Sequence, residues 1–121
     1  AQCLVGSEMC IRDRYKAFAV ILNAAWACDD ARDIGNAVLC RNLALDLIDE
    51  LIEKEEDPST LMLQKIDLLR RSNQFNKALG EFSGIFMDKG LLQDILDFQL
   101  EKAKNHDNAC YTVEAVKKSI V

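Results

Sequence analysis

The chain has 121 residues, of which half are hydrophobic and 29% are charged, and its net charge is −5. This composition predicts one globular domain and excludes a disordered chain. The acidic balance, without a basic stripe interleaved with aromatic residues, argues against nucleic-acid binding. No apolar run is long enough for a membrane span, and no signal-peptide pattern is present, so we expect a cytoplasmic protein with reduced thiols and no membrane partner.

The first fourteen residues differ from the rest of the chain. The stretch CLVGSEMCIRDR, from Cys3 to Arg14, has neither a helical nor a strand period, and its cysteines are too far apart for a zinc knuckle. It resembles the translated adapter sequence that contaminates the ends of assembled reading frames. We therefore predict that residues 1–14 are non-native, that residues 15–121 form the domain, and that the natural protein extends upstream of Tyr15. The alternative is a natural N-terminal helix.

From Tyr15 onward, apolar spacings of three and four predict six helical segments. The first, over residues 16–28, is apolar almost all round. The second, over residues 35–55, carries one continuous apolar stripe, composed of Ala37, Leu39, Cys40, Leu43, Ala44, Leu47, Ile48, Leu51 and Ile52. The acidic run at residues 49–57 overlaps the end of this helix. Helical spacing spreads its carboxylates, so we expect a solvated face and no metal site.

Asp57 and Pro58 mark the start of the third helix, over residues 59–72, because aspartate caps free amides and proline suits the first helical position. The fourth helix begins near Phe75 and is predicted to continue to Lys89, with Gly90 ending it in the left-handed conformation. Its predicted buried face consists of Phe75, Ala78, Leu79, Phe82, Ile85 and Phe86. A fifth helix over residues 91–105 and a short helix after Thr112 complete the chain.

Six helices with short connections favour an all-α fold of three antiparallel helical hairpins, stacked as a short solenoid. The stretch NQFNKALGEF at residues 73–82 resembles the middle of a tetratricopeptide repeat, where Phe75, Ala78 and Phe82 match the aromatic, small and aromatic positions. The segments AAWACDDARD, CRNLALDLI, DLLRRSNQFNKAL and FQLEKAKNHDNACYTVEAV are similar to a group of uncharacterised bacterial proteins. The resemblance implies a TPR-like helical domain behind a zinc-ribbon-like N-terminal segment, with degenerate repeats and no particular activity.

Few residues have a pattern that suggests chemistry. Cys28 and Cys40 are predicted either to meet across the first hairpin or to act as small buried hydrophobes. His106, Asp107 and Cys110 are too few for a structural zinc site, and a polar turn explains them better. No nucleophile has a base beside it and no glycine-rich phosphate loop is present. We therefore predict no enzymatic activity, no cofactor and no metal.

Three residues are candidates for binding a partner. Arg70 and Arg71 form a basic pair in an acidic domain, with Arg71 nearly opposite the core of its helix and Arg70 on the flank. They are predicted to accept a partner carboxylate, or else to face solvent or pair with Asp67. Trp26 is either a core residue or an exposed anchor where an upstream segment docks.

These features predict a non-enzymatic helical-repeat scaffold for protein–protein interaction. The predicted occupant is a protein or peptide partner, or the chain's own upstream segment. The alternative is a transducing domain of a metal-binding regulatory protein whose zinc-ribbon segment is missing from this sequence.

Overall fold

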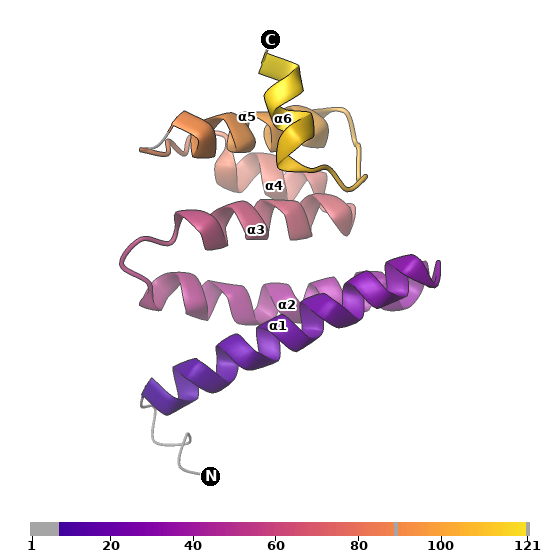
Figure 1. Cartoon of the computed structure of the whole chain (residues 1–121), viewed down its shortest axis with the longest axis vertical. Helices are drawn as coiled ribbons and strands as arrows, with labels where there is room; N and C mark the ends of the chain where they lie inside the picture. The colour runs from indigo at the N-terminus through magenta and orange to yellow at the C-terminus, as the bar shows by residue number, and fades with distance from the viewer. Residues whose placement is uncertain (1–7, 89, 121) are drawn as a thin grey trace. The chain divides into compact units, whose positions relative to one another are not determined.

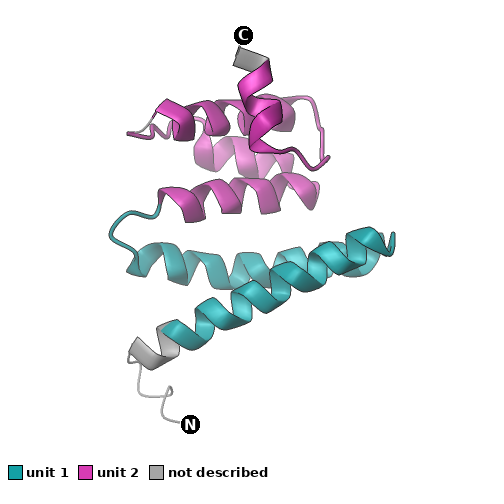
Figure 2. Cartoon of the chain, in the orientation of Figure 1, with its two compact units in different colours: residues 1–58 teal, residues 59–121 magenta. Residues whose placement is uncertain are grey.

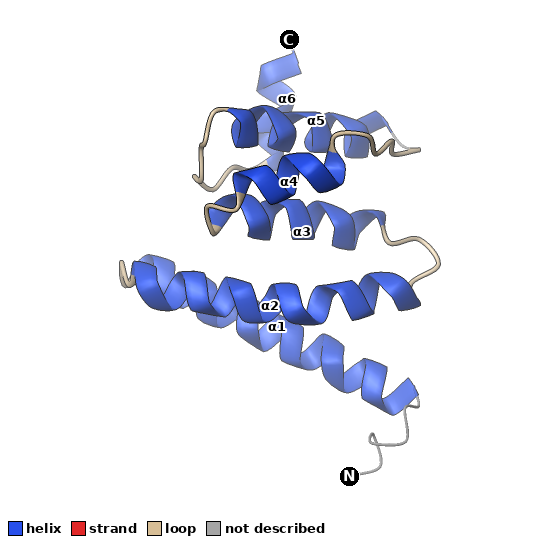
Figure 3. Cartoon of the chain, turned by 180° about the vertical axis from the view of Figure 1, so that it is seen from behind, coloured by secondary structure: helices blue, strands red, loops and turns tan. Residues whose placement is uncertain are grey.

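The structure is a computed structural model that describes residues 8–88 and 90–120, and these residues form six helices (Figures 1 and 3). The helices are α1 (Glu8–Asp30), α2 (Ile34–Lys54), α3 (Ser59–Arg71), α4 (Phe75–Phe82), α5 (Gly90–Lys104) and α6 (Val113–Ile120). The prediction of an all-α chain of six helices is confirmed over this part of the chain. No helix described here combines the length and the apolarity that a membrane crossing requires.

The chain divides into two compact units, residues 1–58 and residues 59–121 (Figure 2). In unit 1, α1 and α2 pack against each other as an antiparallel hairpin. In unit 2, α3 and α4 form a second hairpin, and α5 packs against both of them as well as against α6.

Helix α1 begins earlier than predicted, at Glu8, and continues through the expected boundary at Tyr15 without a break. Two of its residues contact the end of α2, because Arg14 Nε lies 3.0 Å from Glu50 Oε2 and the Tyr15 hydroxyl donates a hydrogen bond to Glu55. Residues 1–7, including Cys3, lie outside the described residues. The non-native origin of residues 1–14 stays a prediction.

The buried face of α2 is narrower than the predicted stripe and includes a charged residue. Its buried residues are Ala37, Arg41, Ala44, Ile48 and Leu51. Leu39 and Leu43, which the prediction placed in the same stripe, are exposed. At about 100° per residue, Leu39 lies on the opposite side of the helix from Ala37. Arg41 is buried because its guanidinium forms a paired contact with the carboxylate of Asp29 on α1, at 3.0 Å for Nη1 and Oδ1.

Helices α1, α3 and α5 end in the same way, with a non-glycine residue in the left-handed conformation. These residues are Arg32 (φ 60°), Asn73 (φ 65°) and His106 (φ 53°). In each case the next amide donates to the carbonyl five residues back, at 2.8, 2.8 and 2.9 Å, joining Asp33 to Cys28, Gln74 to Leu69 and Asp107 to Lys102. This is the Schellman motif, which most often uses glycine at this position because a Cβ atom is unfavourable there.

The strain at Arg32 yields a testable prediction. Replacing Arg32 with glycine should raise the free energy of unfolding by about 0.5–1 kcal/mol, because glycine adopts the left-handed conformation without a steric penalty. The measurement is urea unfolding followed by circular dichroism. Arg32→Ala is the matched control: it removes the same side chain and keeps the Cβ atom, so it should not stabilise. Equal stabilisation by both variants would contradict the role of the backbone.

Helix α4 ends at Phe82 and not at Lys89, which lies outside the described residues. The Ser83 amide donates to the Leu79 carbonyl at 3.1 Å, and its hydroxyl competes for the same acceptor. Ser83 and Gly84 have low helix propensity, so residues 83–88 form a loop. Phe86 is therefore 89% exposed and not part of the buried face. The prediction for Gly90 is also wrong, since it is the first residue of α5 and does not have a positive φ.

Candidate functional site

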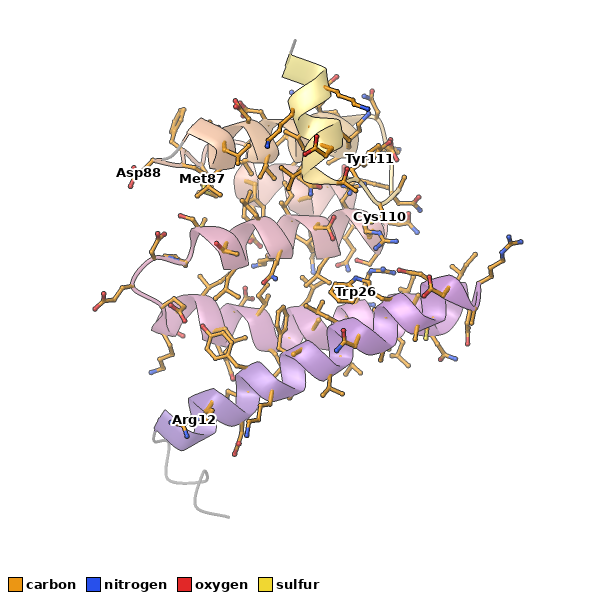
Figure 4. The ribbon with its side chains drawn as sticks, viewed as in Figure 1. Arg12, Trp26, Met87, Asp88, Cys110 and Tyr111 are labelled. Atoms are coloured by element: carbon orange, nitrogen blue, oxygen red, sulfur yellow. The ribbon has the colours of Figure 1, made fainter. Side chains whose placement is uncertain are left out.

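Trp26 lies on α1 with 52% of its surface exposed. The face of α1 that includes Phe18 and Ala25 is buried, and Trp26 lies about 100° away from Ala25 around the helix. Figure 4 labels its side chain, which projects from the ribbon of α1. Of the two alternatives weighed from the sequence, the exposed position is the one that the structure has.

Other large apolar side chains of unit 1 are exposed as well. They are Val20 on α1 and Ile34, Leu39 and Leu43 on α2. Leu39 and Leu43 are one helical turn apart and share a face of α2. An isolated exposed leucine needs no explanation, but five large apolar residues on one two-helix unit indicate surface available for contact.

Arg70 is fully buried, in contrast to the predicted position on the flank of α3. Its Nε donates to Gln99 Oε1 at 2.7 Å, and its Nη1 donates to the carbonyls of Asp107 and Ala109, each at 2.7 Å. Its Nη2 donates to Asp67 Oδ1 at 3.1 Å. The pairing with Asp67, one of the alternatives, is therefore present. Arg70 joins α3 to α5 and to the α5–α6 loop, and its guanidinium does not face a partner.

The loop after α5 is packed around Tyr111, which lies beneath the Arg70 guanidinium at 5.6 Å from its ring centre. The Tyr111 hydroxyl donates to the Asp107 carboxylate, and the ring meets Phe98 edge-on at 5.2 Å between centroids. Lys102 Nζ lies 4.8 Å from the centre of the Tyr111 ring. The hydroxyl of Tyr111, followed by the Ala109 amide, lowers the pKa of Asp107. This carboxylate is thus held ionised as part of the loop.

The predicted His106, Asp107 and Cys110 group does not gather around one point. The His106 ring stacks on Phe75 with 4.9 Å between centroids, whereas Asp107 is bonded to Tyr111. Cys110, which Figure 4 labels, is exposed. The Asp107 carboxylate also accepts the Ala109 amide at 2.9 Å, as expected of a turn former. Within residues 8–88 and 90–120, no group of three or more metal-ligating side chains is arranged to hold an ion.

Arg71, the second member of the predicted basic pair, is half-buried at the end of α3. Its side chain is therefore more accessible than that of Arg70. Arg71 belongs to unit 2 and Trp26 to unit 1. The role of Arg71 in binding a partner stays a prediction.

Cys28 lies on α1 and Cys40 on α2, the two helices of the unit 1 hairpin. Both are free and half-buried. Partial burial raises the pKa of the Cys28 thiol, with further contributions from Cys40, Asp33 and Asp29. Neither cysteine is fully buried, and their meeting across the hairpin stays one of the two predicted alternatives.

The acidic run at the end of α2 faces solvent, as predicted. Its acidic residues Asp49, Glu50, Glu53, Glu55, Glu56 and Asp57 are all exposed. Glu50 pairs with Arg14 of α1.

The sequence analysis did not predict that two arginines, Arg41 and Arg70, are buried in the core. Arg41 falls between Ala37 and Ala44 in the apolar spacing of α2, and Arg70 follows Ile66 by four residues in α3. An arginine in register with a core stripe is a signal for a buried ion pair, because such a position requires a partner for its charge.

Together the fold and these positions define a small all-α domain with an exposed tryptophan. No protein-family model, curated protein or solved structure matches the chain. The class of protein therefore follows from the helices and their surface alone.

Proposed function

We propose that this chain is a non-enzymatic helical-repeat scaffold that binds a protein or peptide partner, with Trp26 as the principal contact. The observation that carries the proposal is the 52% exposure of the single tryptophan on a two-helix unit. Tryptophan is enriched among the residues that dominate binding energy, because it contributes a large apolar area and an indole N–H donor. A soluble domain keeps such a residue exposed at a cost unless a partner covers it.

The helical-repeat part of the proposal is supported by unit 2. There α5 packs against both helices of the α3–α4 hairpin, which is the neighbour relation expected when successive hairpins stack. The shared Schellman ending of α1, α3 and α5 is a second similarity between the three hairpins of the predicted solenoid. The match of Phe75, Ala78 and Phe82 to the tetratricopeptide pattern is compatible with it, since Ala78 and Phe82 are buried.

The surface of unit 1 favours a partner with apolar side chains. Val20, Leu39 and Leu43 add exposed aliphatic area on the two helices of this unit. Amphipathic segments bind such helical surfaces through apolar side chains at helical spacing. The proposed partner is either a separate protein or an upstream segment of the same protein. The proposed compartment is the reducing cytoplasm, which the free thiols of Cys28 and Cys40 suit. Arg71 remains a candidate for binding a carboxylate of the partner. Arg70 does not, because its side chain is buried.

Replacing Trp26 with alanine should strongly weaken partner binding without unfolding the chain. The test selects binders for the immobilised chain from a library of random peptides and then measures Kd for the selected peptides. Tryptophan fluorescence provides a direct signal, since the chain has one tryptophan. We expect wild-type fluorescence to shift on binding and Trp26→Ala to weaken Kd, measured by calorimetry, by about 30-fold or more, the effect of losing an anchor residue.

Phe86→Ser is the matched control, because Phe86 is also an exposed aromatic residue but lies in the α4–α5 loop. This variant should bind the selected peptides with unchanged Kd. If both variants lose affinity equally, binding is unspecific adhesion to apolar surface and the proposal is wrong. The proposal also fails if Trp26→Ala binds as tightly as the wild type.

A further inference from the structure

Helix α1 has an exposed apolar side opposite the side that is buried. Phe18 and Ala25 lie on the buried side. The opposite side, which we call the outer face of α1, consists of exposed small residues, namely Ala17, Val20, Ala24 and Ala27. Val20 is 66% exposed and points about 160° away from Phe18 around the helix. A surface helix usually carries charged and polar residues on the side away from its core, so an apolar outer face is suited to contact with another helix.

The spacing of the outer face matches the core positions of a coiled coil. Ala17 and Ala24 are one heptad apart, and so are Val20 and Ala27. Alternating steps of three and four residues place these side chains at the a and d positions of a heptad. Small side chains at these positions let two helix axes approach to the short end of the usual range of about 8–10 Å. The outer face therefore fits a second helix that lies alongside α1.

The polar residues beside the outer face favour another copy of α1 as this second helix. Lys16, Asn23 and Asp30 are exposed and lie one heptad apart along one edge of the face, at the g positions. In an antiparallel pair of identical helices, the g positions of one helix lie opposite those of the other. Lys16 then meets Asp30 of the second copy, and Asn23 meets its own counterpart. Each end of the paired helices thus brings opposite charges together.

Other arrangements of these two charges gain nothing. Within one helix, Lys16 and Asp30 are fourteen residues apart, or about 21 Å, so the two side chains of one copy are too distant to pair. In a parallel pair of helices, Lys16 would lie level with Lys16 of the second copy and Asp30 level with Asp30. The attraction between opposite charges is therefore available only to the antiparallel pair.

We propose that the chain forms a two-fold symmetric homodimer through the outer face of α1, with the two copies of this helix antiparallel. Two-fold symmetry makes each contact occur twice. Ala17 packs against Ala27 of the second copy, and Val20 packs against its Ala24. Trp26 lies about 120° from Val20 around the helix, outside the interface, so this inference does not rest on the binding role proposed for Trp26.

The experiment measures the mass of the full chain by sedimentation equilibrium over a concentration series. Dithiothreitol is present, so that the five cysteines form no disulfide between copies. We expect the mass to rise with concentration from 13.6 kDa to twice this value. A chain that stays at the monomer mass up to about 1 mM would overturn the proposal and leave the outer face to another occupant, such as an upstream segment.

Ala24→Glu tests the centre of the interface. The variant should weaken dimerisation by about 100-fold or more, because each dimer would bury two unpaired carboxylates. Ala19→Glu is the matched control, since Ala19 is also an exposed alanine of α1 but points about 140° away from Ala24. Its dimerisation should be unchanged, and circular dichroism checks that both variants stay helical. If Ala24→Glu dimerises like the wild type, or if both variants lose the dimer equally, the assignment of the outer face is wrong.

A charge exchange tests the antiparallel pairing. Lys16→Asp and Asp30→Lys each place like charges opposite one another at both ends of the interface, so each should weaken dimerisation by about tenfold. The variant with both changes restores opposite charges in exchanged positions and should dimerise nearly as tightly as the wild type. This recovery can arise only between copies, because the two side chains are too distant within one helix. Dimerisation of the double variant that is no tighter than that of the single variants would contradict the antiparallel pairing.

Discussion

Replacing Arg70 with alanine should lower the free energy of unfolding by about 3 kcal/mol or more, a large part of the stability of a small domain. The variant leaves three acceptors without their donor, namely the carbonyls of Asp107 and Ala109 and the side-chain oxygen Oε1 of Gln99. Each buried acceptor that loses its hydrogen bond costs about 1–3 kcal/mol. The loss of the side chain also leaves space beside Tyr111. Urea unfolding followed by circular dichroism measures the effect.

Two further variants distinguish the network from charge alone. Arg70→Lys keeps the charge but lacks the planar group that reaches four acceptors, so it should lose about 2 kcal/mol. Lys104→Ala, an exposed cation on α5 in the same unit, should change stability by less than about 0.5 kcal/mol. If Arg70→Lys were as stable as the wild type, the hydrogen-bonding geometry assigned to Arg70 would be wrong.

Replacing Phe82 with alanine should cost about 3–5 kcal/mol, because the buried ring would leave a cavity in unit 2. Phe82 is only 2% exposed, at the last position of α4, which packs against α3 and α5. Urea unfolding of the purified chain measures the loss.

Phe86→Ala is a closely matched control, since it removes the same side chain four residues further along. Phe86 is 89% exposed, so its loss should change stability by less than about 0.5 kcal/mol. The amphipathic pattern placed both rings on one buried face and would predict similar losses. Similar losses in the experiment would mean that α4 continues to residue 86 and that the assignment of residues 83–88 to a loop is wrong.

The helices themselves were predictable because their signals are local. Asp57 and Pro58 gave the start of α3 at Ser59, and apolar spacing gave the start of α4 at Phe75, as the structure has them. Where local signals conflict, the prediction failed. An apolar pattern continues from Phe82 to Phe86, but Ser83 and Gly84 favour a turn, and this turn ended the helix. Gly90 attracted the left-handed assignment that Arg32, Asn73 and His106 have instead.

The candidate site was predictable only in part. Trp26 was chosen by its residue type, with a core position and an exposed position as alternatives, and the structure exposes it. The sequence placed Arg70 on the flank of α3, because helical spacing gives only the direction of a side chain around its own helix. Its burial depends on the carbonyls of the α5–α6 loop, which lie 37 and 39 residues further along the chain.

By itself the sequence determined the helical class, the number of helices and the acidic surface at the end of α2, because period, capping residues and charge act within a few residues. The tertiary structure alone decided which side of each helix is buried and which arginine side chains lie in the core. Burial depends on what another helix or loop presents, and a charged side chain enters a core only where distant groups satisfy its donors. Among the residues that the structure describes, Arg41 has such a partner in Asp29, and Arg70 has such partners in the α5–α6 loop.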